Sequence, residues 1–130
     1  MKTRAQQYSQ QVYQQIAELD FADKKQEKLY GSICHQFPIM VLRAGLAQSV
    51  AFLWIKAESG KPAYEKFMQH LSTITGFEGE TREVFQQRIH RMPIDEYRRT
   101  THIILNACIW YKRFAESLLN VQSGEGTDHD

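Results

Sequence analysis

Residues 30–57, YGSICHQFPIMVLRAGLAQSVAFLWIKA, decide the predicted fold. The second half of this stretch, residues 46–57, has the length of a helix, is rich in good helix formers and contains one charged residue, Lys56. A helix that is apolar on nearly all sides is normally buried, because no other position hides all of its faces from water. We therefore expect residues 46–57 to form the central helix of a bundle. Six large side chains would each contribute about 1.5–3 kcal/mol on burial: Leu46, Val50, Phe52, Leu53, Trp54 and Ile55.

The segment before this helix is predicted to contain two more helices. Residues 4–19 carry apolar side chains along one side at helical spacing, and a second helix follows over residues 24–36. Asp23 and Gln26 are spaced as in a capping box, which favours a helix start at that point. Gly31 lies inside the second helix, where glycine costs about 1 kcal/mol relative to alanine. Its presence there indicates close packing against a neighbour.

Proline and glycine mark the remaining predicted boundaries. Pro38 is expected to end the helix of residues 24–36, because proline disfavours helical geometry in the residue before it. A short helix through Arg43 then leads to a corner at Gly45. The Gly-Lys-Pro sequence that ends at Pro62 indicates the end of one helix and the first turn of the next. Further helices are predicted over residues 62–75, 81–91 and 94–120.

The fold class follows from these segments. No part of the chain shows sustained apolar–polar alternation or a hairpin turn signal. At 130 residues the chain has the length of one domain, and its 42% apolar composition is ample for a core. The sequence therefore predicts an all-α fold, a single compact bundle of about six helices over residues 1–121. Residues 122–130 are polar, have nothing to bury and are predicted to form a disordered tail.

The sequence favours a soluble protein of the cytoplasm. Its two cysteines, Cys34 and Cys108, lie in apolar helical patterns, which argues against a disulfide framework and for a reducing compartment. The N-terminal residues lack the apolar core of a signal peptide. The longest apolar run, residues 50–55, is far shorter than the roughly 20 residues that span a bilayer. We therefore expect no membrane partner.

No common catalytic motif is present. The sequence contains no nucleotide-binding glycine motif, no serine nucleophile elbow and no His-Glu-x-x-His zinc motif. Cys34 and His35 are adjacent and point to different sides of a helix, so they make a poor metal pair. Tyr64 and Tyr97 have the spacing of core residues more than of platforms for bases. We expect no catalytic residue, metal site or cofactor, although ribonuclease chemistry by histidines such as His35 and His102 stays open.

The last predicted helix has an uneven charge distribution. Residues 82–113 carry seven basic and three acidic side chains. At 100° per residue, apolar side chains fill most of the surface of the helix of residues 94–120 and leave a narrow polar sector. A basic stripe short of acids fits an anionic partner, and equally an ordinary solvated face. The sector holds Arg98, Arg99, His102, Asn106, Arg113 and Glu116, with Lys112 at its edge.

Several short sequences occur in a characteristic order along the chain. They are Tyr-Gly-Ser at 30–32, Phe-Pro at 37–38, Gly-Leu-Ala-Gln at 45–48, Ala-Phe-Leu at 51–53, Glu-Tyr-Arg-Arg-Thr at 96–100 and Trp-Tyr-Lys-Arg-Phe-Ala-Glu at 110–116. In this order and spacing, the chain from Arg4 to Leu119 resembles the small-subunit family of Cmr-type (type III-B) CRISPR effector complexes.

This resemblance implies an all-helical subunit without catalytic activity of its own, which acts in antiviral defence. In this family several copies stack along a filament of RAMP-type backbone subunits that holds the CRISPR RNA. The small subunits line the groove occupied by target RNA, and a large polymerase-domain subunit lies at one end. The implied partners are therefore these protein subunits, other copies of the chain, and guide and target RNA. Many relatives carry another basic residue near the position of His102, so the resemblance implies a weaker anionic contact at that position.

A subunit that accepts any target sequence is expected to contact phosphates and to leave sequence reading to base pairing. Two alternatives stay open, namely a scaffold subunit that contacts only protein, and a small ribonuclease. The predicted RNA-contacting residues are Arg98, Arg99, Lys112 and Arg113 on the last helix, Arg43 at the corner and, more weakly, Lys24, Lys25 and Lys56.

Overall fold

Six α-helices make up the core of this computed structural model, which describes residues 1–124. The described residues contain no β-strand, so the predicted all-α bundle is confirmed. None of these helices is long and apolar enough to cross a membrane. Residues 125–130, the greater part of the predicted tail, lie outside the described residues. The helices are α1 (Arg4–Ala17), α2 (Lys24–Ala44), α3 (Leu46–Glu58), α4 (Pro62–Ile74), α5 (Arg82–Arg91) and α6 (Ile94–Leu118).

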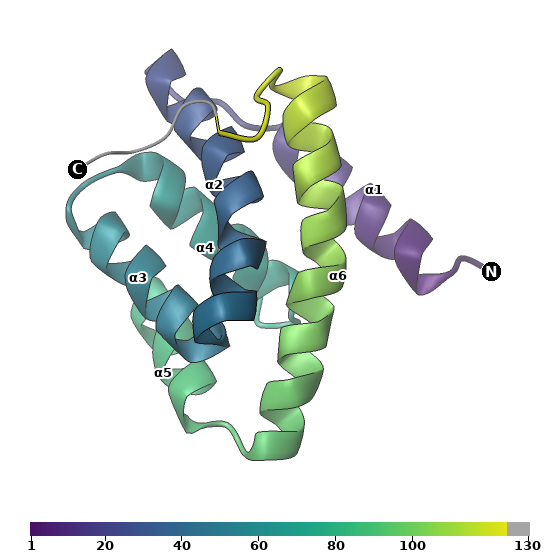
Figure 1. The fold of residues 1–130 in the computed structure, drawn as a ribbon, viewed down its shortest axis with the longest axis vertical. Helices are drawn as coiled ribbons and strands as arrows, with labels where there is room; N and C mark the ends of the chain where they lie inside the picture. The colour runs from purple at the N-terminus through teal and green to yellow at the C-terminus, as the bar shows by residue number, and fades with distance from the viewer. Residues whose placement is uncertain (125–130) are drawn as a thin grey trace.

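Helices α2 and α6 occupy the middle of the molecule. They lie side by side, with α1 packed against α6, α4 against α2, and α3 packed on α4 and α5 (Figure 1). Both cysteines lie in this core and are free. The apolar residues of both helices have helical spacing, which is why one face of each is buried. These residues are Leu29, Ile33, Phe37 and Val41 on α2, and Ile104, Cys108, Tyr111 and Ala115 on α6.

The prediction that residues 46–57 form the central helix is wrong. Helix α3 lies on the outside of the bundle, where Ile55 is 61% exposed and both Phe52 and Trp54 are only partly buried. The central place belongs to α2, which is less apolar but whose buried Tyr30 and His35 each form a hydrogen bond to a distant part of the chain, with His35 Nδ1 left unpaired within residues 1–124. The Tyr30 hydroxyl pairs with a histidine of α4, and His35 donates a hydrogen bond to a backbone carbonyl. Paired polar groups carry little burial penalty, so apolar content alone did not identify the central helix.

The prediction that Pro38 ends a helix is also wrong. Helix α2 runs without a break from Lys24 to Ala44 with Pro38 inside it. A proline in a helix interior costs about 3 kcal/mol. Phe37 and Val41, on either side, are both almost fully buried, and each contributes about 1.5–3 kcal/mol. This packing outweighs the proline, and α2 ends instead at the predicted corner, where Gly45 has φ 89°.

The capping box predicted at the start of α2 does not form. Asp23 caps the helix as expected, but the Gln26 side chain turns away and accepts a hydrogen bond from the Ala63 N–H at 3.0 Å. Gln26 thereby satisfies a free N–H in the first turn of α4 and ties the two helices together. A capping box exists elsewhere, between Thr3 and Gln6, and it begins α1.

The close packing predicted at Gly31 is confirmed, and its neighbour is the turn that follows α6. A Cβ atom on Gly31 would lie 2.6 Å from a methyl group of Val121, so no larger side chain fits there. The Val121 carbonyl accepts a hydrogen bond from His35 Nε2 at 2.8 Å, and its N–H donates to the Ala115 carbonyl at 3.0 Å. These contacts fasten the end of α6 onto α2. The predicted domain boundary after Val121 stays a prediction.

Candidate nucleic-acid interface

The outward face of α6 carries the polar residues that the sequence predicts there. We call Arg98, Arg99, His102, Asn106, Lys112 and Arg113 the α6 row, and all six side chains are exposed. Arg99, Asn106 and Arg113 are seven residues apart, so they lie nearly in one line at intervals of about 10.5 Å. The exposed face is broader than predicted, because Ile109 and Leu118 also face solvent.

The arginines of the molecule fall into two electrostatic classes. Arg82 pairs with Glu58 at 3.1 Å and with Glu65 at 2.7 Å, and the Glu58 contact raises its pKa further. Arg88 is similarly paired with Glu80. Within residues 1–124, by contrast, none of the basic side chains of the α6 row forms an ion pair. Their charge is therefore available to an anionic partner.

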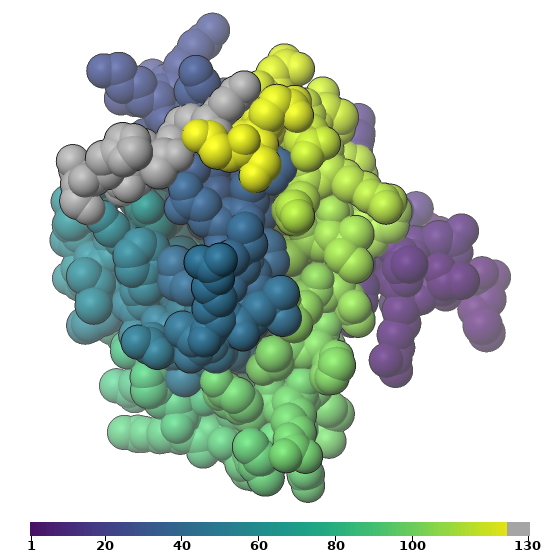
Figure 2. Space-filling view, viewed as in Figure 1, coloured from purple at the N-terminus to yellow at the C-terminus, as the bar shows by residue number. Residues whose placement is uncertain are grey.

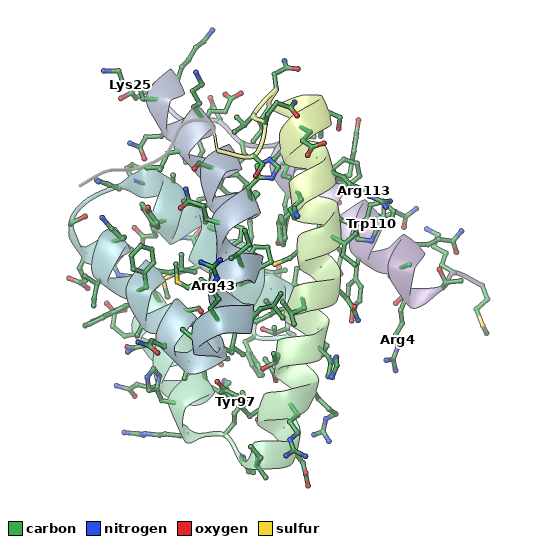
Figure 3. All side chains as sticks on the ribbon, viewed as in Figure 1. Arg4, Lys25, Arg43, Tyr97, Trp110 and Arg113 are labelled. Atoms are coloured by element: carbon green, nitrogen blue, oxygen red, sulfur yellow. The ribbon has the colours of Figure 1, made fainter. Side chains whose placement is uncertain are left out.

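The other predicted contact residues lie elsewhere. Arg43 is exposed near the C-terminal end of α2, whereas Lys24 and Lys25 are exposed at its other end, about 28 Å away by helical rise. Figure 3 shows this separation, and it places Arg113 on a different part of the surface from Arg43. The Lys56 ammonium lies 5.8 Å from the centre of the Phe52 ring on α3. The structure thus places the predicted α6 residues along one helix and the others on α2 and α3, with the Arg43 end of α2 close to Tyr97 at the start of α6.

Tyr64 and Tyr97 have the structural roles that the sequence favours. Tyr64 is only 2% exposed. The Tyr97 hydroxyl accepts a hydrogen bond from the Ala47 N–H at 2.9 Å, which satisfies the first turn of α3. The buried Tyr64 ring offers no face to a base. Tyr97 does anchor the start of α6, and so fixes the position of the neighbouring Arg98 and Arg99.

The histidines do not converge on one site. His35 is buried against the end of α6, His70 is half-buried on α4, and His102 is exposed on the α6 row. Burial, helped by the charge of Lys66, lowers the pKa of His70 from 6.5 to about 4. Neutral His70 therefore accepts the Tyr30 hydroxyl at Nδ1, at 2.6 Å. Across the described part of the chain, no three His, Cys, Asp or Glu side chains are grouped so as to hold a metal ion.

Sequence reasoning missed the contribution of α1 to this surface. In Figure 2, α1 projects beyond α6 at the right-hand edge of the view. Arg4 and Tyr8 of α1 line the same groove as Trp110 and Arg113 of α6. Tyr8 belongs to the apolar side of the helix that the sequence predicts over residues 4–19, and it is only partly buried. One sequence feature could have indicated this contribution, namely the Thr-x-x-Gln capping sequence of Thr3 and Gln6. It fixes the residue at which α1 begins, and therefore the direction in which the side chains of its first turns point.

Comparison with known proteins identifies the family. A family model described as CRISPR-associated protein (Cas_Cmr5) matches residues 4–118. A protein of Thermus thermophilus, described as CRISPR system Cmr subunit Cmr5, is 29% identical over 119 residues, which cover 92% of this chain and 98% of that protein. A crystal structure of a CRISPR-associated Cmr5 family protein from the same organism matches with a TM-score of 0.74 at 26% identity, over 92% of this chain and 99% of that chain. The resemblance seen in the sequence is confirmed, and the chain belongs to the Cmr5 family of CRISPR-associated proteins.

Proposed function

We propose that this chain is a non-catalytic small subunit of a type III-B CRISPR effector, the Cmr complex, which acts in antiviral defence in the cytoplasm. Copies of it stack along the filament of RAMP-type backbone subunits, near the large polymerase-domain subunit. Its basic helix faces contact the phosphates of guide and target RNA. Membership of the family supports this proposal, as does the similarity to a protein described as a Cmr subunit.

The observation that carries the RNA contact is the α6 row. Four of its six side chains are Arg or Lys, all are exposed, and none of the four forms an ion pair with residues 1–124. The planar guanidinium group matches a phosphate through two parallel hydrogen bonds. Phosphate contacts carry no sequence information, so this surface suits a subunit that must accept any target.

A direct test replaces Arg98 and Arg99 together by alanine and measures binding of single-stranded RNA over a range of salt concentrations. Each lost phosphate contact reduces the log–log salt slope by about 0.7, so we expect the slope to fall by about 1.4. The melting temperature should stay nearly unchanged, because both side chains are exposed and form no ion pair with residues 1–124.

The matched control replaces Lys28 and Arg91 by alanine, which removes the same charge at two exposed positions that are not among the predicted RNA-contacting residues. If both pairs change the slope equally, long-range charge explains binding and the α6 row has no special part in it. If the arginine pair leaves the slope intact, or if its loss unfolds the protein, the α6 row has been misinterpreted.

Exposed apolar side chains favour a second candidate function, that of a scaffold subunit without RNA contact. Leu42 is 74% exposed, Ile94 62% and Ile39 44%, and side chains of this kind commonly enter protein interfaces. Crosslinking of the assembled complex to target RNA separates the two functions, because a scaffold would crosslink through α6 only to protein. The ribonuclease hypothesis has less support, since His35 and His70 are already engaged in structural hydrogen bonds.

A further inference from the structure

A groove of about 370 Å³ opens between α1 and α6, next to the α6 row. Arg113 and Trp110 lie together at the junction of the two helices, and Arg4 projects from α1 beyond them (Figure 3). We call this feature the α1–α6 groove. Its walls include Arg4, Ala5 and Tyr8 from α1, and Asn106, Trp110 and Arg113 from α6.

The polar groups of the groove are free to bind a ligand. Neither guanidinium group, of Arg4 or of Arg113, forms a hydrogen bond or an ion pair anywhere in residues 1–124. The same is true of the Tyr8 hydroxyl and of the Asn106 side-chain amide within that range. No acidic residue lines the groove. An anionic ligand that also carries hydrogen-bond donors and acceptors would therefore pair with guanidinium, hydroxyl and amide groups that have no hydrogen-bonding partner within residues 1–124.

The aromatic groups of the groove are held in a fixed arrangement. The Arg113 guanidinium carbon lies 5.1 Å from the centre of the Trp110 ring. That ring stacks on Phe114 with 5.9 Å between centroids and 25° between planes. Tyr13 braces Phe114 edge-on, at 5.5 Å and 80°. Because the column is already assembled, a flat ligand that extends it would have little side-chain ordering to offset.

We propose that the α1–α6 groove is a binding site for one nucleotide of single-stranded RNA. The base extends the column of Trp110 and Arg113, with the Asn106 amide at its edge, and Arg4 contacts an adjacent phosphate. Bases stack on both aromatic rings and guanidinium planes, and the two together mark single-strand sites. Arg99 continues the line of Asn106 and Arg113 along α6 and would receive the next part of the backbone. This inference rests on the proposed RNA contact and adds a place where a base is held.

The chain contains two tryptophans, so a Trp54→Phe variant leaves Trp110 as the only one. Trp110 fluorescence of this variant would be titrated with an oligouridylate of about 12 nucleotides and with an abasic oligomer of equal length and charge. We expect quenching that saturates with the oligouridylate and not with the abasic oligomer. Trp54 belongs to α3, so Trp54→Phe by itself should leave affinity unchanged. This measurement requires no substitution in the groove, so it decides the matter even if groove variants fold poorly.

A second arm measures affinity and salt slope in Trp110→Ala and Trp110→Phe. Loss of one stacked base should weaken binding by about 5- to 150-fold in the alanine variant. The salt slope should stay unchanged, because no phosphate contact is removed, and phenylalanine should restore most of the affinity. A merely structural role of Trp110 would instead show as a lower melting temperature with intact RNA affinity per folded molecule.

The outcomes separate this inference from the proposed function. If RNA and the abasic oligomer bind equally and Trp110 fluorescence does not change, the nucleotide site is refuted while the phosphate contacts of the α6 row stand. If neither oligomer binds, the RNA contact itself is refuted, and the nucleotide site with it. If Trp110 responds to purified backbone subunits and not to RNA, the groove is a protein-docking site and the inference is overturned.

Discussion

At the scale of single residues, the pair of Tyr30 and His70 makes stability depend on pH. Burial lowers the pKa of His70 to about 4 from 6.5, so the unfolded chain binds a proton more readily than the folded one. The stabilisation is therefore fully present above pH 6.5 and is lost as the pH falls from 6.5 through 4. A shift of one pKa unit corresponds to about 1.4 kcal/mol. Between pH 7 and pH 4, the free energy of unfolding of wild type should therefore fall by about 3 kcal/mol more than that of His70→Gln, as measured by urea unfolding.

The cause of this dependence can be checked with Tyr30→Phe. Desolvation of the imidazole ring is the largest influence on the pKa of His70. Tyr30→Phe should therefore be less stable overall, yet between pH 7 and pH 4 it should still lose most of the unfolding free energy that wild type loses relative to His70→Gln. If its pH profile instead matched that of His70→Gln, the hydrogen bond and not burial would control the titration. The pair itself was not predictable from the sequence, because its members lie 40 residues apart on different helices.

At the scale of helices, α2 is the element with an identifiable internal conflict. Pro38 removes one hydrogen bond from a continuous helix and is held there by packing on both sides. Pro38→Ala should therefore raise the free energy of unfolding by about 1–3 kcal/mol, since alanine restores the missing N–H. Pro62 provides a matched control at the first turn of α4, where proline is well suited, so Pro62→Ala should lower stability slightly. Equal effects of the two substitutions in urea unfolding would contradict this account.

The helices also show how far the sequence could be used. The starts of α4, α5 and α6 and the corner at Gly45 were predictable, because proline, glycine and spacing act locally. Which helix lies in the centre was not predictable in this way. It depends on partners distant in sequence, such as the carbonyl of Val121 that receives His35. The exposed position of Arg98 and Arg99 followed from helical spacing, whereas the groove that Arg4 and Arg113 both line depends on the packing of α1 on α6.

At the scale of the whole molecule, the basic side chains are divided between holding the fold and facing outward. Arg82 belongs to the first group, because it reaches Glu58 of α3 and Glu65 of α4 from the first turn of α5. It therefore links three helices, and Arg82→Ala should lower the melting temperature. The loss should shrink in 1 M salt, where the screening length falls to about 3 Å.

Arg91, exposed at the end of the same helix, is the matched control, and Arg91→Ala should leave the melting temperature unchanged. A drop as large for Arg91→Ala would mean that α5 responds to net charge and not to the particular pairs of Arg82. The opposite pattern is expected of RNA binding, where loss of Arg98 and Arg99 changes affinity without changing stability.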